Sequence, residues 1–144
     1  MASDNQAIVL RSCRVDDIHK VLDLWKRAEA IPRPTDHPTA LRLRLERDQD
    51  LFLIALDGRR IVGSLMGGWD GWRGGMYRLT VDPSYRRSGI ARRLVQEVES
   101  RLRKLGAERI TALLFKGELG AAAFWQSVGY AIDDDIERWM KDLT

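Results

Sequence analysis

The chain has 144 residues, of which 44% are hydrophobic and 31% are charged, a length and a composition that predict one globular domain. The net charge is only +3, and although the isoelectric point is near 9.3, the arginines are spread along the chain, which permits an anionic ligand without favouring nucleic acid. No apolar run reaches the roughly 20 residues that cross a bilayer, and residues 1–6 lack the features of a secretory signal, so we expect a cytoplasmic protein with no membrane contact. Cys13 is the only cysteine and the chain has two histidines, so we expect no metal site.

The first third of the chain predicts a strand followed by two helices. The segment AIVLRSC is typical of a strand, and Ile18, Val21, Leu22 and Trp25 recur at the spacing of one apolar helical face. Three prolines in IPRPTDHP exclude regular structure there, and the last of them suits the first turn of a second helix, PTALRLRLERD.

A hairpin occupies the middle of the chain. A turn at Asp57-Gly58 joins the apolar strand LFLIAL to the strand RIVGSLMGGW, and the glycine-rich DGWRGG leads on to a further strand, MYRLTV. Trp69 and Trp72 bracket this connection. Two large rings in a polar turn either cover the end of the sheet or line an acceptor site, and the sequence leaves both interpretations open.

The second half predicts a long helix, a strand, a short helix and two last strands. The loop DPSYRRSG leads into a helix with one apolar stripe, which Gly106 ends. ERITALLF predicts a strand, residues 119–128 predict a short helix, and YAIDDDIERWMKDL predicts a final pair of strands. Alternating strands and helices around a central hairpin predict an α+β or mixed α/β fold, with helices on both faces of a sheet.

The stretch LTVDPSYRRSGIARRLVQEVE indicates chemistry. A strand ends at Val81 and a helix opens at Gly89, and the first turn of a helix has unpaired N–H groups that attract phosphate. Gly89 and Ala91 leave the backbone bare, and four arginines can add positive charge: Arg86, Arg87, Arg92 and Arg93. The spacing fits neither a Walker loop nor a dinucleotide fingerprint, and a plain strand-to-helix turn is an equal interpretation of it.

Three segments, in this order, resemble the GNAT N-acetyltransferase superfamily. LTVDP at residues 79–83 resembles the end of its fourth strand, RRSGIA at 86–91 matches its R/Q-x-x-G-x-G/A signature, and AAAFWQSVGY at 121–130 resembles its A-x-x-F-Y-x-x-x-G-F/Y segment. The stretch GGWDGWRGGMYRL is also similar to a bacterial branch of that family, related to the ribosomal-protein alanine acetyltransferases.

The resemblance implies a fold and a site for acetyl-CoA. The fold is one domain over residues 1–144, with a mostly antiparallel sheet of six to seven strands, splayed between the fourth and fifth, and about four helices on both faces. The co-substrate acetyl-CoA would lie in this opening, with its pantetheine arm and its thioester along the backbone of Leu79, Thr80 and Val81. The loop and helix would bind the pyrophosphate through Arg86, Arg87, Ser88, Gly89, Ile90, Ala91 and Arg92. The later segment would add Glu118, Ala121 and Phe124, although relatives often carry Asn where Glu118 stands.

The implied reaction is direct attack on the thioester by a primary amine of a protein or peptide N-terminus, a lysine or a small molecule. Many relatives have a Tyr that donates a proton to the leaving sulfur at the position of Trp125, whose indole is not a practical acid near neutral pH. Strand alternation predicts that Tyr77 shares a face with Leu79 and Val81, which makes it the nearest candidate for proton transfer, with packing as the alternative.

Two other functions stay open. Trp125 in place of Tyr is also compatible with a module that binds the cofactor without turnover. The high isoelectric point is compatible with a nucleic-acid-binding domain, but no basic stripe with stacking aromatics accompanies it, so we expect an amine acceptor as partner and no nucleic acid. A homodimer is a further possibility that the resemblance implies.

Overall fold

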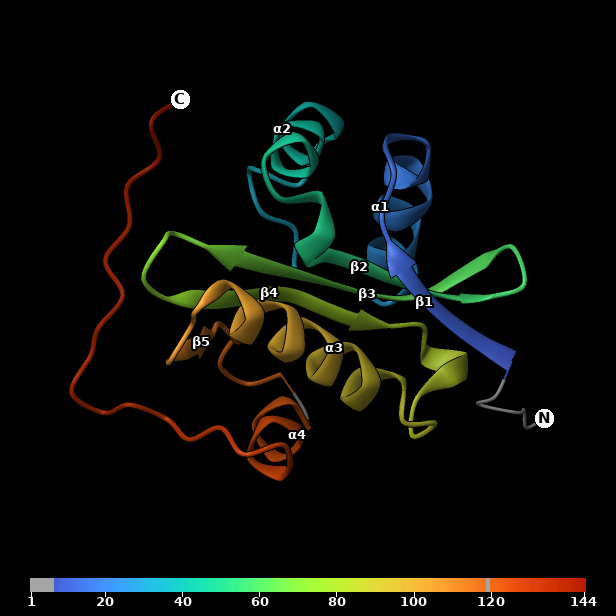
Figure 1. The fold of residues 1–144 in the computed structure, drawn as a ribbon. Helices are drawn as coiled ribbons and strands as arrows, with labels where there is room; N and C mark the ends of the chain where they lie inside the picture. Colours follow the sequence, from blue (N-terminus) through green and yellow to red (C-terminus); the bar gives the residue numbers. More distant parts are fainter. Residues whose placement is uncertain (1–6, 119) are drawn as a thin grey trace. The chain divides into compact units, whose positions relative to one another are not determined.

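The computed structural model describes residues 7–118 and 120–144. They divide into two compact units, residues 1–113 and residues 114–144, and each unit is described by itself. The first unit is built on a sheet whose strands follow one another in chain order (Figure 1). These strands are β1 (Ile8–Ser12), β2 (Phe52–Asp57), β3 (Arg60–Trp69), β4 (Gly74–Val81) and β5 (Ile110–Ala112).

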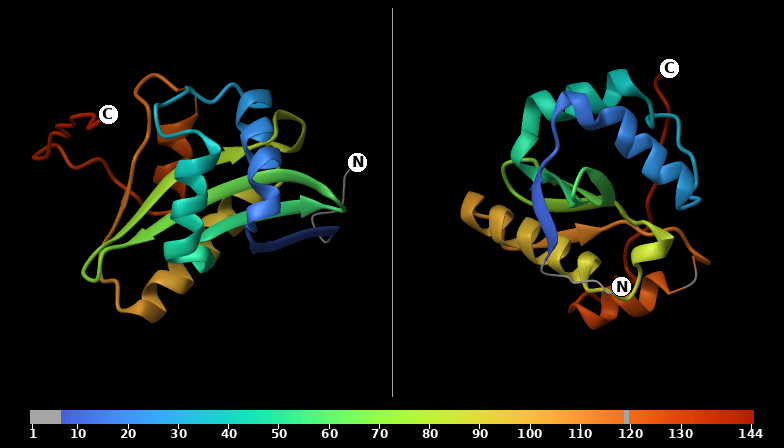
Figure 2. Two further views of the ribbon diagram at one scale, coloured as in Figure 1. Left: turned by 90° about the horizontal axis from the view of Figure 1, so that it is seen from above. Right: turned by 90° about the vertical axis from the view of Figure 1, so that its right-hand side faces the viewer.

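The sheet is mixed, because β1 to β4 are antiparallel neighbours and β5 runs parallel to β4. Helices cover both of its faces (Figures 1 and 2). One face carries α1 (Ile18–Arg27) and α2 (Pro38–Asp48), and the other carries α3 (Ile90–Leu105). Short 3-10 turns lie before α1, before β2 and after β4: η2 (Val15–Asp17), η3 (Gln49–Leu51) and η4 (Pro83–Tyr85).

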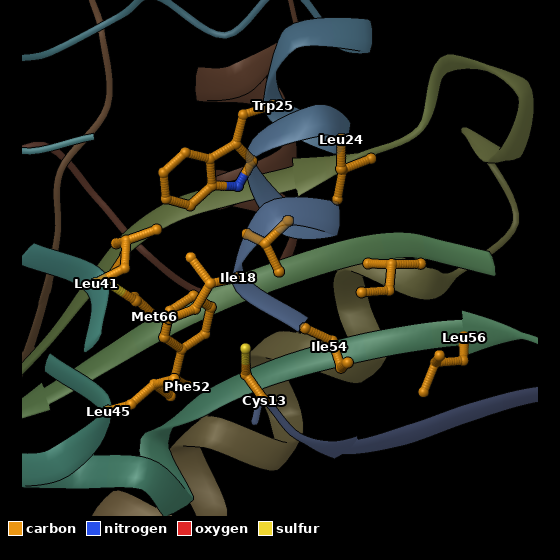
Figure 3. Packing of buried hydrophobic residues seen from close by; sticks show 12 residues of the cluster. Cys13, Ile18, Leu24, Trp25, Leu41, Leu45, Phe52, Ile54, Leu56 and Met66 are labelled. Carbon is orange, nitrogen blue, oxygen red and sulfur yellow. The ribbon is translucent and has the colours of Figure 1, made fainter. Parts of the chain in front are cut away.

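The core beneath α1 and α2 follows the periodicities read from the sequence. Ile18, Val21 and Trp25 are buried, as the helical spacing predicts, whereas Leu22 of the same predicted face is only partly buried. Every second residue of β2 packs against them, as Figure 3 shows for Phe52 and Ile54. The intervening residues of β2 are also buried, because α3 covers the other face of the sheet.

Three glycines let α3 approach the sheet closely. A Cβ added to Gly63 would lie 2.9 Å from a side-chain carbon of Ile90, and one added to Gly74 would lie 2.8 Å from Leu102. At Gly67 the added Cβ would lie only 2.7 Å from Val98 Cγ1. Side chains at these positions would push the helix outward, and so the glycines fix the distance between α3 and the sheet.

We expect Gly67→Ala to lower the free energy of unfolding by about 1–2 kcal/mol, because an added methyl overpacks this interface. Val98 can shift a little, but the carbonyl oxygen of Leu51, 3.2 Å from the added Cβ, belongs to the backbone. Urea unfolding of the two proteins measures the difference. In a Val98→Ala background the same substitution should cost less, and an equal cost in both backgrounds would contradict the explanation.

The second unit contains the helix α4 (Ala121–Ser127), which confirms a short helix within the predicted residues 119–128. Residues 120 and 128 are turn, and residue 119 lies outside the described residues. Residues 131–144 form no helix or strand, so the predicted final pair of strands is wrong, and the sheet of the described residues has five strands instead of six or seven. Asp133 to Asp135 are three adjacent like charges of a type that strands disfavour, and Ile132, Ile136 and Trp139 stay exposed.

Candidate functional site

A β-bulge interrupts β4 near its middle. Arg78 and Leu79 of β4 together stand opposite the single residue Leu65 of β3. Arg78 has φ 60°, in the left-handed region that residues other than glycine rarely adopt. The pairing of β4 with β5 ends just before the bulge, at Met76. The bulge therefore lies where β4 loses its second neighbour.

Before the bulge, even-numbered residues of β4 turn their backbone groups toward β5. The N–H of Gly74 donates to the carbonyl of Arg109 at 3.1 Å, and the carbonyl of Met76 accepts from the N–H of Leu113 at 3.2 Å. In an uninterrupted strand the same alternation would turn residues 78 and 80 toward that side.

After the bulge, the odd-numbered residues of β4 turn their backbone groups toward the β5 side. The N–H of Asp82 donates to the carbonyl of Val62 on β3 at 2.8 Å, so the alternation turns the N–H and C=O groups of Val81 and Leu79 away from β3. Within the described residues β5 ends at Ala112 and offers them no ladder partner. Leu79 and Val81 thus form an open strand edge.

The bulge also corrects the expectation that Tyr77 and Val81 share a face. Tyr77 pairs with Met66, which packs beneath α1 and α2, whereas Val81 pairs with Gly63, which faces α3. The Tyr77 ring lies back over Gly75, with its hydroxyl 2.6 Å from the point where a Cβ of Gly75 would be. Tyr77 therefore points toward the start of β4 and away from the open edge.

Asp82, the first residue after β4, anchors the loop that leads to α3. Its nearly buried carboxylate accepts hydrogen bonds from the Ser84 N–H at 2.9 Å, from Arg27 Nε at 3.1 Å and from Arg60 Nη2 at 3.0 Å. Burial alone would raise the pKa of Asp82, but these bonds to the charged form outweigh it and lower the pKa. An anion at neutral pH therefore holds the start of the loop.

Further along the loop, two hydroxyl groups fix its course. The Tyr85 hydroxyl donates to the carboxylate of Asp57 in the β2–β3 turn, and the Ser88 hydroxyl donates to the Tyr85 carbonyl. Arg87 and Gly89 then adopt left-handed conformations, with φ 63° and 85°, and Gly89 is the N-cap of α3.

The N-terminus of α3 has the chemistry of an anion cradle. The N–H groups of residues 89–91 have no acceptor within α3, and no side chain caps the helix at Gly89. The positive end of the dipole of this 16-residue helix lies there, and Arg86, Arg87, Gly89 and Arg92 are exposed. The Ile90 side chain is buried, so this residue can offer only its backbone N–H to a ligand.

The other predicted site residues belong to the second unit. Ala121, Phe124 and Trp125 are the least exposed residues of α4, and their spacing places them on one helical face. The Trp125 ring makes edge-to-face contacts with Phe124 at 5.5 Å and with Tyr130 at 4.9 Å between ring centroids. Glu118 precedes the helix and its carbonyl accepts from the N–H of Ala121 at 3.3 Å.

Trp69 and Trp72 lie at the β3–β4 turn, at the other end of β4 from the loop of residues 82–89 (Figure 1). They line a hollow of about 450 Å³, together with the end of α3 and the residues before β5. The Arg73 guanidinium stacks 4.2 Å from the Trp72 ring centroid, and Trp72 is 70% exposed. This placement gives no support to an acceptor site at the tryptophans, and Trp72 covers little of the sheet.

Sequence reasoning missed the side chains that surround the bulge. Arg78 pairs with Asp36 of the α1–α2 loop, with Nε at 3.2 Å from Oδ1, and its guanidinium lies 5.1 Å from the Trp25 ring centroid. No local pattern marks a positive φ at an arginine or a partner 42 residues earlier.

The described residues offer little to other chemistries. Cys13 is fully buried, and burial raises its pKa to about 12, so its thiol packs as a small apolar group. Among residues 7–118 and 120–144, no cluster of three or more His, Cys, Asp or Glu side chains could hold a metal ion, and none of the helices is long and apolar enough to cross a membrane.

An open strand edge that leads to an uncapped helix N-terminus has the chemistry to pair with an extended ligand that carries a phosphate group. Residues 18–130 match the model of the acetyltransferase (GNAT) family. The acetyltransferase SG1711 of Sodalis glossinidius (strain morsitans) is 35% identical over 128 residues, which cover 88% of this chain and 89% of that protein. The chain belongs to the GNAT family and is an acetyltransferase, and this family uses acetyl-CoA.

Solved structures bear out the fold. The PaiA N-acetyltransferase of Thermoplasma acidophilum, solved with coenzyme A, superposes with a TM-score of 0.79 at 17% identity, over 88% of this chain and 91% of that chain. The ribosomal-protein-S18-alanine N-acetyltransferase of Escherichia coli gives a TM-score of 0.69 at 17% identity, over 85% of this chain and 76% of that chain. At these identities the likeness shows the GNAT fold alone, which confirms the predicted α+β class.

Proposed function

We propose that residues 1–144 form one N-acetyltransferase domain, which moves the acetyl group of acetyl-CoA to a primary amine by direct attack on the thioester. The observation that carries this proposal is the bulge of β4. It turns the backbone groups of Leu79 and Val81 toward a side where β5 has ended, and the same strand continues through the loop to the uncapped N-terminus of α3.

The two parts of the site match the two ends of acetyl-CoA. The amides of the pantetheine arm pair with Leu79 and Val81 as an added strand would. The Thr80 side chain between them is buried and does not obstruct the arm. The pyrophosphate binds the N–H groups of residues 86–91, with charge from Arg86, Arg87 and Arg92. For Glu118, Ala121 and Phe124 the family motif alone supports a contact with the cofactor.

The reaction has two chemical requirements. An alkyl ammonium with a pKa near 10.4 is neutral in only about one molecule in a thousand at pH 7.4, so the site must remove a proton from the acceptor. As the neutral amine attacks, the carbonyl oxygen gains negative charge, and the Leu79 N–H at the open edge is placed to stabilise it. The carbon–sulfur bond then breaks, coenzyme A leaves as a thiolate, and the nitrogen, now part of an amide, gives up one further proton to water. Because the Tyr77 hydroxyl points away from this edge, we assign it no step.

The acceptor is the amine of a protein or peptide N-terminus, a lysine or a small molecule. The similarity to a branch related to the ribosomal-protein alanine acetyltransferases supports peptides with an N-terminal alanine as the first to test.

Thermal unfolding with acetyl-CoA and thiol release with a panel of amines test the proposal together. We expect saturating acetyl-CoA to raise the Tm, because a ligand that binds only the folded state stabilises it. At least one panel member, drawn from N-terminal alanine peptides, lysine peptides and polyamines, should release thiol faster than buffer does. An unchanged Tm would contradict binding, and a raised Tm without thiol release from any amine would favour a cofactor-binding module.

Trp125→Tyr distinguishes the proposed acetyltransferase from a module that binds the cofactor without turnover, the second function that the sequence suggests. A phenol at this position can protonate the leaving sulfur, whereas an indole cannot, so we expect kcat to rise up to about tenfold. The pH profile should gain a limb on its alkaline side, where the phenol ionises. Trp125→Phe is the matched control, which keeps a ring without an acidic proton and should not raise kcat. A tyrosine variant that behaves like the wild type would show that this position takes no part in the chemistry.

A further inference from the structure

Arg78 holds the bulge of β4 in a conformation that is unfavourable for its own residue type. At φ 60° the Cβ atom of an L-residue crowds the following carbonyl, and glycine or asparagine commonly occupy such positions. Contacts of the side chain must therefore compensate for the backbone strain.

The guanidinium makes these contacts with two elements. Its Nε donates to Asp36 Oδ1 at 3.2 Å, and Nη2 donates to Asp36 Oδ2 in a bidentate pair. Its Cζ lies 5.1 Å from the centroid of the Trp25 ring. The side chains of Arg78 and Asp36 are only 11% and 16% exposed, so water screens their attraction much less than it screens a surface pair.

Both partners are fixed in turn. Asp36 Oδ2 accepts from the Arg33 N–H at 2.8 Å, and the Asp36 N–H donates to the Arg33 carbonyl at 3.0 Å, so this carboxylate organises the α1–α2 loop. The Trp25 Nε1–H donates to the buried Ser64 Oγ at 2.9 Å, and Ser64 pairs with Thr80 on the far side of the bulge. The contacts thus connect Arg78, through Trp25 and Ser64 of β3, back to Thr80 of β4 on the other side of the bulge.

We infer that Arg78 is a positioning residue, whose ion pair with Asp36 keeps β4 bulged and so aims the Leu79 N–H at the thioester carbonyl. The bulge turns this N–H outward, and the ion pair holds the bulge. The inference rests on the proposed function, because it assigns the Leu79 N–H to the oxygen that gains charge during acetyl transfer. The α1–α2 loop, through Asp36, thereby influences the rate of the reaction.

Substitutions at Arg78 separate the backbone conformation from the side-chain contacts. Arg78→Gly removes every side-chain contact but allows a positive φ without strain, whereas Arg78→Ala removes the same contacts and disfavours it. We expect kcat to fall at least tenfold in Arg78→Ala and in Asp36→Ala, with the KM for acetyl-CoA changed less than twofold. Arg78→Gly should keep at least a third of the wild-type kcat. Adding Asp36→Ala to Arg78→Gly should then have little further effect, because the pair is already absent.

Asp48→Ala is the matched control for the loss of an ion pair. It breaks the pairs of Asp48 with Arg44 at 3.3 Å and with Arg47 at 3.0 Å, of which the first is buried to a similar extent, and should leave kcat unchanged. If Arg78→Gly is as slow as Arg78→Ala, the contacts matter by themselves and the inference is overturned. A wild-type kcat in Arg78→Ala would overturn it as well.

NMR distinguishes a failure of this inference from a failure of the proposed function. The cross-strand nuclear Overhauser effects between Ser64 and Thr80 report the bulged register whether or not the protein turns over. We expect them to persist in Arg78→Gly and to weaken or shift in Arg78→Ala. If the wild type acetylates no amine, the proposed function fails while this measurement still tests the bulge, and an unchanged register in Arg78→Ala would refute the inference.

Discussion

Gly89→Glu is expected to weaken acetyl-CoA binding at least a hundredfold, about 2.7 kcal/mol, while the protein stays folded. Gly89 is the N-cap of α3, with φ 85°, and no side chain caps the helix there. A glutamate there brings a carboxylate to the position proposed for the pyrophosphate, and its Cβ disfavours the left-handed conformation that aims the first N–H groups of the helix. Calorimetric titration measures the affinity, and the rise of Tm with acetyl-CoA should disappear.

Gly71→Glu is the control for this prediction. Gly71 also has a positive φ, 93°, with open space around an added Cβ, and it lies in the β3–β4 turn at the other end of β4. The variant introduces the same charge and a similar backbone strain, so it should lower the Tm of the free protein comparably but keep its affinity for acetyl-CoA. Equal losses of affinity in the two variants would mean that the effect is not local to the loop.

Local patterns were sufficient to predict most of the elements in the first unit. The spacing of Ile18, Val21 and Trp25 predicted α1 and its buried face, and the turn residues at Asp57-Gly58 predicted the hairpin of β2 and β3. Helix periodicity and Gly106 likewise predicted α3 and its C-terminal end. In each case the signal and the structure lie within one element, where a fixed backbone period decides which side chains are buried.

The bulge shows where such patterns fail. Alternation along MYRLTV predicted one face for Tyr77 and Val81, and one extra residue at Arg78 reversed it. Arginine carries no preference for a positive φ, and the carboxylate that holds it comes from Asp36, which precedes α2, β2 and β3 in the sequence. Tertiary contacts set this conformation, so a single sequence contains no local sign of it.

The predicted final strands failed for a related reason. Residues 130–143 contain apolar side chains between polar ones, but strand formation requires a partner edge and a buried face. Ile132 and Trp139 are more than 80% exposed, so no such face forms among the described residues. The run of aspartates at 133–135 further disfavours pairing.

Asp82→Ala is expected to lower the free energy of unfolding by about 3 kcal/mol and to weaken acetyl-CoA binding. The carboxylate is 3% exposed, and its loss removes three hydrogen bonds, two of them from guanidinium groups, which contribute about 1.5–3 kcal/mol each when well shielded. Arg27 and Arg60 are 38% and 55% exposed, so water screens both interactions. We therefore expect the loss of unfolding free energy to lie at the lower end of the sum of the two guanidinium contributions. The binding effect follows because Asp82 holds the start of the loop of residues 82–89.

The isosteric Asp82→Asn gives this prediction a pH signature. The pKa of Asp82 is lowered in the folded state from its unfolded value near 3.9, so the ionised carboxylate stabilises the fold above that value. This contribution is lost as the pH falls through the lowered pKa. The difference in unfolding free energy between wild type and variant should therefore be constant between about pH 7 and 5 and should shrink below about pH 4.

Urea unfolding at pH 7, 5 and 3 measures this difference. Asp70→Asn is the matched control, because the Asp70 carboxylate accepts only from the exposed N–H groups of Trp72 and Arg73 in a turn, and its loss should change the stability far less. An Asp82→Asn protein as stable as the wild type at pH 7 would show that the amide satisfies both guanidinium groups. A difference as large at pH 3 as at pH 7 would show that shape, and not charge, makes this residue necessary.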